Sequence, residues 1–394
     1  MERTSVAIVG AGPAGLLLGC ILAAEGVDFV LVEHRSREHV LSRIRAGVLE
    51  QASVDVLDRY GLGERLHREG LVHGGVYLQS GTDRFHVDFE ELVGRTVTVY
   101  GQQQVVLDLM RHHDELGSAV HYGATDVTPS GVDGDDPHLR FTVDGEEHDV
   151  AADVIVGADG YHGVCRTLIP DEVLAPAERG YDAAWLGILA DVAPSTDELI
   201  YALHPDGFAM HSMRSPSVSR LYLQVDPTED IANWSDERIW AGLQERLATP
   251  GWTLTPGPIT EKSITPMRSS VAATLAYGRL FLAGDAGHIV PPTGAKGLNA
   301  AIADVALLGA ALAERARGSD GPLAAYSEKA LARQWKVQSF SQFMTDLLHT
   351  PGSAVPADER AFRYASRVGQ LRYVQGSRYA QQFIAEQYTG LAIA

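Results

Sequence analysis

The N-terminal segment alternates between short apolar runs and one helix-like pattern. Residues 5–9 form an apolar run that stops at glycine, and residues 29–33 form a second one. Between them, residues 14–25 carry leucines at helical spacing before Gly26. A strand, a glycine turn, a helix and a strand within about 30 residues predict parallel strands joined by a right-handed crossover.

Later segments show two kinds of strand pattern. Residues 153–157 and 279–283 are short apolar runs that stop at Gly and Asp, as buried strands of the same parallel sheet do. Residues 72–99 and 185–225 alternate apolar and polar positions, which predicts an antiparallel sheet.

Helix and turn signals complete the pattern. Residues 298–312 place apolar side chains on one face of a helix that runs to Gly318. Ser235, followed by two acidic residues, predicts a helix N-cap. Residues 130–137 have the composition of a hairpin tip.

Together these patterns predict a mixed α/β chain. We expect a Rossmann-like lobe with a parallel sheet, an inserted antiparallel-sheet lobe and a C-terminal helical tail. The expected bounds are 1–71, 97–180 and 269–349 for the first lobe, 72–96 and 181–268 for the second, and 350–394 for the tail.

Acidic residues outnumber basic ones along the chain. Among 394 residues there are 32 Lys and Arg and 51 Asp and Glu, so the formal net charge is -19. This field repels phosphate backbones and anionic lipids, so we expect no nucleic acid and no membrane partner. The 2 cysteines form no disulfide framework or Zn site, and no apolar run reaches about 18 residues. A cytoplasmic protein without a metal is expected.

Residues 10–15 read Gly-Ala-Gly-Pro-Ala-Gly and lie between a predicted strand and a predicted helix. Such glycines let a pyrophosphate approach the backbone at a helix N-terminus. Glu33 ends the second strand, where a carboxylate accepts hydrogen bonds from a ribose diol and disfavours a 2'-phosphate. The motif therefore predicts FAD or NAD rather than NADP at this turn.

Two further motifs favour FAD. Gly157-Ala158-Asp159-Gly160 and Gly284-Asp285-Ala286-Gly287-His288 each place an Asp just beyond a predicted strand. In this order and spacing, the three motifs resemble those of the FAD-dependent aromatic hydroxylases, the single-component flavoprotein monooxygenases.

Longer segments resemble the 4-hydroxybenzoate-hydroxylating members of this family over nearly the full chain. They are residues 43–51, 71–76, 96–102, 198–209, 211–215, 219–225 and 284–299. The resemblance implies hydroxylation of 4-hydroxybenzoate to 3,4-dihydroxybenzoate with NADH or NADPH and O2, through a flavin C4a-hydroperoxide. It also implies a homodimer, with the tail contributing to the interface. Two alternatives remain open: the same fold acting on 3-hydroxybenzoate or an aminobenzoate, and a flavin-binding regulatory protein.

The resemblance also assigns residues to FAD. The positive N-terminus of the helix after residue 297 is expected to face the negative charge of reduced flavin, with Lys296 adding to that field. Arg220 is implied to help set the position of the flavin. The implied FAD contacts are Gly10, Gly12, Ala14, Gly15, Glu33, Arg43, Ile44, Arg45, Ala46, Gly47, Val48, Gln102, Asp159, Arg220, Asp285, Lys296, Gly297, Leu298 and Asn299.

The resemblance also assigns separate sets of residues to the substrate and to the nicotinamide nucleotide. Tyr201, Tyr388 and His73 are implied to carry the phenolic proton outward, and His73 is expected to titrate near neutral pH. The implied substrate contacts are Tyr201, Ser212, Met213, Arg214, Tyr222, Pro292 and Thr293, with Pro292 and Asn299 also catalytic. The implied NAD(P)H contacts are His34, Arg35, Arg37, His39, Arg45, His162 and Arg268. Because Glu38 opposes a 2'-phosphate, we expect NADH to be accepted.

Overall fold

A central sheet surrounds the N-terminal strand of the computed structural model, which describes residues 2–43, 47–352 and 354–393. Its strands are β1 (Glu2–Val9), β2 (Phe29–Val32), β8 (Val120–His121), β9 (Thr125–Ser130), β10 (His138–Val143), β11 (Glu146–Gly157), β17 (Ala276–Tyr277) and β18 (Leu280–Leu282). β1 pairs in parallel with β2 and β11, and β11 pairs in parallel with β18, which confirms the predicted parallel sheet. β9 and β10 pair antiparallel, so the predicted hairpin tip is also confirmed.

Helices cover this sheet and build its core. They include α1 (Pro13–Ala24), α3 (Gln51–Arg59), α6 (Gln102–Leu116) and α9 (Gly297–Ala316). α1 packs between α6 and α9, and its leucines are fully buried. Within the described ranges, α9 alone is long and apolar enough to cross a membrane, but 67% of that window is buried inside the protein. It is therefore a core helix of this lobe.

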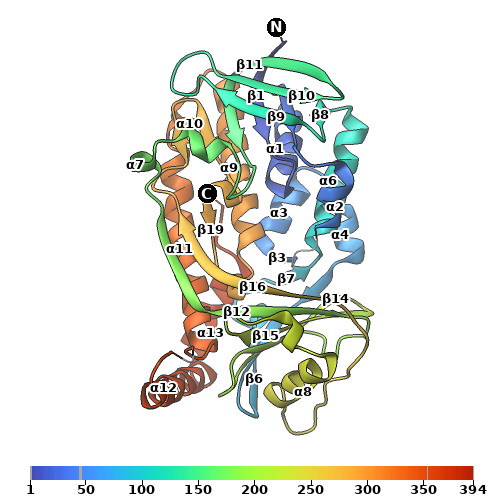
Figure 1. Cartoon of the computed structure of the whole chain (residues 1–394), viewed down its shortest axis with the longest axis vertical. Helices are drawn as coiled ribbons and strands as arrows, with labels where there is room; N and C mark the ends of the chain where they lie inside the picture. Colours follow the sequence, from blue (N-terminus) through green and yellow to red (C-terminus); the bar gives the residue numbers. More distant parts are fainter. Residues whose placement is uncertain (1, 44–46, 353, 394) are drawn as a thin grey trace.

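The second large sheet lies across the other end of the molecule (Figure 1). Its strands are β5 (Gly75–Ser80), β6 (Asp83–Asp88), β12 (Ala177–Ala190), β13 (Leu199–Leu203), β14 (Ala209–Ser215), β15 (Val218–Val225), β16 (Ile259–Val271) and β19 (His288–Ile289). Most neighbours are antiparallel, as predicted, but β13 pairs with β5 in parallel. The prediction of a purely antiparallel sheet is wrong there, because β5 and β13 are far apart in the chain and are not joined by a hairpin.

A third, small sheet lies between the two large ones. It contains β3 (Val48–Glu50), β4 (Leu71–His73) and β7 (Val97–Val99), all antiparallel. The alternating pattern of residues 72–99 predicted one sheet, whereas the structure divides this segment between the small sheet and β5–β6. This division places β3 and β7 where the two lobes meet.

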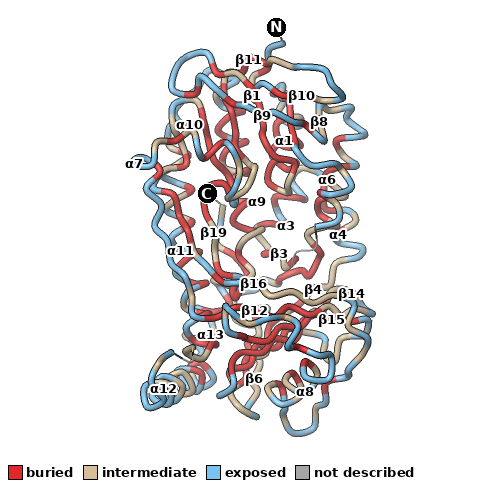
Figure 2. Tube along the Cα trace, viewed as in Figure 1, coloured by how far each residue is buried: buried red, intermediate tan, exposed pale blue. Residues whose placement is uncertain are grey.

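The remaining helices lie around the sheets. They are α2 (Arg37–Ser42), α4 (Glu64–Glu69), α5 (Phe89–Val93), α7 (Asp171–Leu174), α8 (Asp236–Arg246), α10 (Gly321–Ala324), α11 (Tyr326–Leu348), α12 (Ala357–Gly376) and α13 (Arg378–Thr389), with 3-10 turns η1 (Cys165–Leu168), η2 (Ile231–Asn233), η3 (Gly284–Ala286) and η4 (Pro292–Gly294). Ser235 caps α8 by accepting from the Arg238 N–H, as predicted. α11 runs along the length of the molecule from beside α10 to the second sheet (Figure 1). α12 shows a largely exposed surface (Figure 2).

Candidate active site

The glycine turn between β1 and α1 is shaped by contacts that only glycine allows. Gly10 has φ +106°, and a Cβ there would lie 2.4 Å from the Ala158 carbonyl oxygen. A Cβ on Gly15 would lie 1.9 Å from the Gly10 carbonyl oxygen. Beside Gly12, by contrast, no atom lies within 4 Å of where a Cβ would be. The helix N-terminus therefore presents an open backbone face at Gly12, which fits a pyrophosphate.

Glu33 lies at the end of β2, next to this turn. Its carboxylate is buried and accepts hydrogen bonds from the backbone N–H groups of Ala11 and Arg35, both at 2.8 Å. His34 Nδ1 lies 2.9 Å from the same carboxylate. The turn and the acidic side chain are thus held together before any ligand arrives, which suits recognition of a ribose diol.

The two later Asp motifs differ in what their side chains do. Asp159 is largely enclosed, accepts from the Cys165 N–H at 2.9 Å and leaves its other oxygen without a partner. Burial raises the pKa of this carboxyl. Asp285 is exposed on η3. Asp304 on α9, which sequence reasoning missed, accepts from the Gly284 N–H at 2.9 Å and so fixes the turn that presents Asp285. An Asp within an otherwise apolar helix face was the available signal.

The start of α9 is fastened to β3. The Asn299 side chain donates to the Val48 carbonyl at 2.8 Å and accepts from the Glu50 N–H at 2.9 Å. Gly297 and Leu298 occupy the first turn of α9, and Ala14 is buried in α1. Gly47 approaches the Tyr100 carbonyl so closely that a Cβ would lie 2.0 Å from it, next to Gln102 at the start of α6. These segments are suited to bind FAD where the glycine turn, β3 and the start of α9 come together.

Lys296 is buried in an ion pair that sequence reasoning missed. Its Nζ lies 2.5 Å from Glu50 Oε1, and the two side chains are 3% and 4% exposed. It also donates to the Gln387 carbonyl oxygen. Glu50 Oε2 also lies 3.6 Å from Arg333 Nη2, so two cations share one carboxylate, and the expectation that Lys296 adds to the positive field stays a prediction. The contact with Gln387 fixes the segment before Tyr388.

A pocket of about 600 Å³, counting the part open to solvent, lies between the second sheet and the β3–α9 region. Six expected substrate residues line it, together with Arg220, Gly47 and Val48 of the expected FAD set. The six are Tyr201, Ser212, Met213, Arg214, Tyr222 and Pro292.

One part of the pocket carries positive charge and hydroxyls. The Arg214 guanidinium donates to the Gln103 side chain, and burial, together with the neighbouring Arg220 guanidinium, lowers its pKa. Arg220 donates through Nε to the Tyr222 hydroxyl at 3.1 Å. Ser212 is buried on β14, the strand that also carries Arg214. Two cations beside two hydroxyls suit a carboxylate ligand.

Two tyrosines form a buried hydroxyl pair. Tyr201 lies on β13 and lines the pocket, and Tyr388 lies on α13, 187 residues later. Their hydroxyl oxygens are 2.5 Å apart. Burial raises the pKa of both groups, so both stay protonated near neutral pH. Neutral hydroxyls both donate and accept, so the pair offers a path for a proton.

His73 lies on β4 and is 1% exposed, with neither ring nitrogen hydrogen-bonded. Burial lowers its pKa to about 4, although the nearby carboxylates of Glu198 and Asp197 oppose this change. The expectation that His73 titrates near neutral pH is therefore wrong. This burial could not be predicted from the sequence, because the polar His73 faces inward while the apolar Val72 beside it is 66% exposed.

Other pocket residues differ from the sequence-based expectation. Thr293 is buried and its hydroxyl bonds to Thr345 at 2.8 Å, so its side chain is absent from the lining. Apolar walls were missed, among them Trp185, Leu199 and Met210. They look like ordinary core positions in the sequence, and only the fold places them around a ligand.

The expected nicotinamide residues fall into two groups. Near β2, His34 contacts the Glu33 carboxylate, and Arg35 is exposed. Arg37 on α2 makes a two-point ion pair with Asp114, and His39 lies on the same helix. Ile44, Arg45 and Ala46 lie outside the described residues, and Arg43 is the last described residue before them.

The second group surrounds Tyr161. The guanidinium carbons of Arg268 and Arg166 lie over this ring, 4.0 Å and 4.2 Å from its centroid. His162 meets the ring edge-on. Arg166, which sequence reasoning missed, is 8% exposed and its Nη1 has no hydrogen-bond partner. A buried cation with a spare donor suits an anionic ligand.

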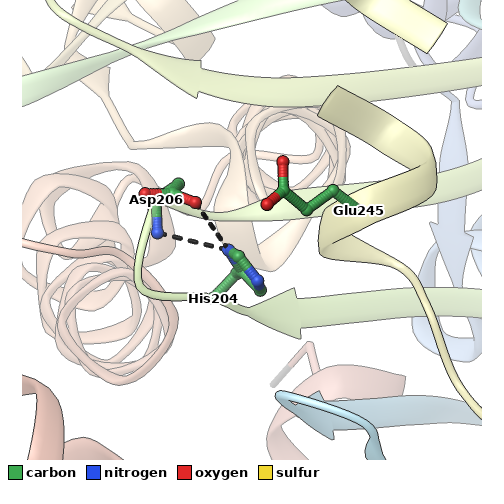
Figure 3. Close-up of side chains that lie close together, drawn as sticks. All are labelled: His204, Asp206 and Glu245. Carbon is green, nitrogen blue, oxygen red and sulfur yellow. Dashed lines mark hydrogen bonds and ion pairs between the residues drawn. The ribbon is translucent and has the colours of Figure 1, made fainter. Parts of the chain in front are cut away.

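Among the described residues, one group of side chains lies close enough to hold a cation. His204, Asp206 and Glu245 have ligand atoms within 4.8 Å of one another (Figure 3). Both carboxylates are exposed, and His204 Nδ1 already accepts from the Asp206 N–H at 3.2 Å. These residues do not line the pocket and form a solvated surface cluster.

Comparisons with known proteins agree with this geometry. A family described as "FAD binding domain" matches residues 3–341. A p-hydroxybenzoate hydroxylase of Acinetobacter baylyi is 45% identical over 392 residues, covering 99% of this chain and 96% of the relative. A 3-amino-4-hydroxybenzoate 2-monooxygenase of Streptomyces cremeus is 28% identical, covering 88% of each. The crystal structure of a p-nitrophenol 4-monooxygenase of Pseudomonas putida shares the fold, with a TM-score of 0.81, 20% identity and 99% of each chain covered.

Both matches extend over the segments that form the glycine turn, the buried carboxylate beside it and the lining of the aromatic pocket, and one of them has 45% identity. The chain uses FAD, a nicotinamide co-substrate and O2, and it acts on a small aromatic molecule. It therefore belongs to the FAD-dependent aromatic hydroxylases.

Proposed function

We propose that this monooxygenase converts 4-hydroxybenzoate, NAD(P)H, H⁺ and O2 into 3,4-dihydroxybenzoate, NAD(P)⁺ and water. The observation that carries the proposal is one pocket holding both a cationic hydroxyl-rich wall and the Tyr201–Tyr388 pair. The cationic wall suits a carboxylate, and the tyrosine pair suits a phenol. The 45% identical relative bears the name of this activity.

The carboxylate is bound by residues of the second sheet. Arg214 makes a two-point contact, and the hydroxyls of Ser212 and Tyr222 complete the set. Tyr222 already accepts from Arg220 at 3.1 Å, which leaves its own hydroxyl hydrogen available to an anion. The ring then lies against apolar walls such as Trp185 and Leu199.

The phenol faces Tyr201. Hydroxylation next to the phenol requires electron density in the ring, which loss of the phenolic proton supplies. Tyr201 accepts that proton in a hydrogen bond and donates its own to Tyr388, 2.5 Å away. Because both tyrosines stay neutral in the buried site, they pass a proton without storing charge. Pro292 also lines this pocket, and we propose that its carbonyl accepts a hydrogen bond from the same region of the ligand.

FAD, when bound, supplies the redox chemistry by taking electrons from NAD(P)H and activating O2. We propose that Gly12 and Glu33 hold its nucleotide part and that the first turn of α9 lies at its ring system. Residues 1–71, 97–180 and 269–349 then form the FAD-binding part, residues 72–96 and 181–268 cover the substrate, and residues 350–394 close the site with Tyr388.

NADH is accepted as electron donor under this proposal. Arg37 is engaged by Asp114, and the neighbouring Glu38 is exposed and repels a 2'-phosphate. Arg166 and Arg268 over Tyr161 supply the positive charge for the nucleotide, and His162 lies against the edge of the same ring. Measuring kcat/KM for both donors tests this, and a preference for NADPH above about tenfold contradicts it.

The substrate is tested by following NAD(P)H oxidation and product together, with and without 4-hydroxybenzoate. We expect strong stimulation and nearly one product per NAD(P)H. Stimulation with peroxide as the sole product identifies another aromatic acid, such as an aminobenzoate, as the substrate. No stimulation by any such acid favours a flavin-binding regulatory protein.

Tyr201→Phe sharpens the same test. The variant should bind 4-hydroxybenzoate but lose about 10²–10⁴-fold in hydroxylation, the range expected when a proton-transfer group is removed. NAD(P)H oxidation should continue and yield peroxide. Full coupling in this variant contradicts the tyrosine relay.

Two properties of the whole protein complete the proposal. We propose a cytoplasmic homodimer that associates through the exposed aromatic side chains of α12 and α13. These are Phe362, Tyr373, Tyr379 and Phe383. Sedimentation of Phe362→Ser/Tyr379→Ser should show monomer where the parent shows dimer, and a monomeric parent contradicts the proposal.

A further inference from the structure

Trp185 forms a wall of the aromatic pocket, and its indole is held from behind by a histidine. Its Nε1–H donates to His349 Nε2 at 2.7 Å. Both side chains are 4% exposed. Phe208 stacks on both rings, at 5.1 Å from Trp185 and 4.5 Å from His349. The three rings form one packed unit behind the substrate pocket.

The protonation state of His349 is fixed by its two neighbours. Because Nε2 accepts from Trp185, the hydrogen is on Nδ1, which donates to the Thr345 carbonyl at 3.0 Å. Burial and the nearby Arg367 guanidinium lower the pKa of His349 to about 3, although the bond to Thr345 opposes this. The imidazole is therefore a neutral acceptor throughout the working pH range.

The end of α11 is fastened to the same wall by a second contact. Gln224 on β15 lies directly across from Trp185 on β12. It donates to the Thr350 carbonyl at 2.7 Å and accepts from the Thr350 N–H at 3.0 Å. His349 and Thr350, the two residues after α11, therefore bind Trp185 and Gln224, which lie opposite each other on neighbouring strands. The indole has little freedom to move as a result.

The same stretch of α11 also reaches the other side of the pocket. Thr345, which anchors His349, bonds to the Thr293 hydroxyl at 2.8 Å. Thr293 follows Pro292, which lines the pocket. One helix end therefore sets the distance between the Trp185 wall and the η4 turn.

We propose that His349 is a positioning residue for the hydroxylation: by accepting from Trp185 Nε1–H it holds the indole as a flat wall that sets the position of the substrate ring. His349 itself is not among the residues that line the pocket. The inference rests on the proposed function, because it concerns the pocket assigned to the aromatic acid. Its consequence is that loss of the acceptor loosens the ring and wastes reducing equivalents as peroxide.

Two substitutions separate this role from simple packing. His349→Gln keeps an acceptor oxygen within reach of the indole, whereas His349→Leu fills similar space without one. For His349→Leu we expect the KM for 4-hydroxybenzoate to rise about tenfold, the effect of leaving one buried donor unpaired. Product per NAD(P)H should fall, while flavin content and NAD(P)H oxidation without substrate stay at the wild-type level. His349→Gln should restore most of both losses.

A double-mutant cycle with Trp185→Phe tests whether His349 acts through the indole. Trp185→Phe/His349→Leu should be no worse in KM or coupling than Trp185→Phe alone. Additive losses overturn the proposal, as does an equal loss in His349→Gln and His349→Leu. If His349→Leu does not fold, Trp185→Phe with His349 intact must show lowered coupling, and wild-type coupling there overturns it.

The wild-type assay keeps this test distinct from that of the proposed function. A wild type stimulated by a different aromatic acid contradicts the substrate proposal, and the variants are then compared with that acid. A wild type coupled to 4-hydroxybenzoate whose His349→Leu variant is equally coupled overturns the role of His349 alone.

Discussion

The turn that fits the flavin and the pocket that fits the aromatic acid recognise their ligands with different atoms. At the turn, Gly10, Gly12 and Gly15 offer backbone, and the one contributing side chain, Glu33, is held by backbone N–H groups. In the pocket, recognition comes from side chains such as Tyr201 and Arg214 on separate strands of one sheet. A backbone site is encoded in a few consecutive residues, whereas a side-chain site exists only once the sheet has formed.

The two regions should therefore fail in different ways. At the turn, a single added methyl group either destroys the fold or blocks the ligand, depending on which glycine carries it. In the pocket, a conservative exchange should leave the fold intact and alter only substrate binding. The buried Glu50–Lys296 pair lies where the regions meet and should affect both.

The largest expected effect comes from Gly15→Ala. Its Cβ would lie 1.9 Å from the Gly10 carbonyl oxygen, which belongs to backbone and has no room to yield. We expect a loss of roughly 5 kcal/mol in unfolding free energy and no bound flavin. Denaturant titration and flavin absorbance of the purified protein provide the measurement.

Gly12→Ala is the matched control for Gly15→Ala. Gly12 has φ -70°, and no atom lies within 4 Å of its Cβ position. The apoprotein should keep its stability within about 1 kcal/mol, while flavin affinity falls because the methyl group occupies the open face. Full flavin content in this variant would falsify the assignment of a pyrophosphate to the turn.

The next largest effect is expected for Lys296→Met. Removing one partner of a buried ion pair costs about 3–5 kcal/mol, and we expect the lower end of this range because Arg333 Nη2 still lies 3.6 Å from Glu50 Oε2. The variant also frees the Gln387 carbonyl, so the segment that carries Tyr388 should loosen and coupling should fall. Glu50→Gln alone should also destabilise the protein, because it leaves both Lys296 and Arg333 without their carboxylate. Unchanged stability in both single variants would contradict a compensating role for the pair.

A smaller effect, limited to binding, is expected for Arg214→Lys. Lysine keeps the charge but loses the planar two-point contact with a carboxylate. We expect KM for 4-hydroxybenzoate to rise about 10–100-fold, or about 1.4–2.8 kcal/mol, with flavin content unchanged. An unchanged KM would place the carboxylate elsewhere in the pocket.

The same difference between regions explains how far the sequence could be interpreted. Gly10 to Gly15 and Glu33 could be assigned from local spacing, because the turn and the adjacent strand end form within one unit. Tyr388 gained its role from family resemblance alone, since 187 residues separate it from Tyr201. Glu50 and Trp185 were missed because their partners lie 246 and 164 residues away. The burial of His73 was missed because the polar residue faces inward on β4 while the apolar Val72 beside it is exposed.

The smallest expected effect concerns pH and comes from His73. Its pKa of about 4 in the folded protein is below the value of about 6.5 expected when unfolded, so its contribution to stability is present above pH 6.5 and is lost as pH falls towards 4. Between pH 7 and pH 5 this loss should amount to about 1–2 kcal/mol. His73→Asn removes the titrating group, so its unfolding free energy should fall less over that interval in urea titrations. Equal falls in both proteins would mean that His73 is hydrated and titrates normally, and would restore it as a near-neutral proton acceptor beyond the tyrosines.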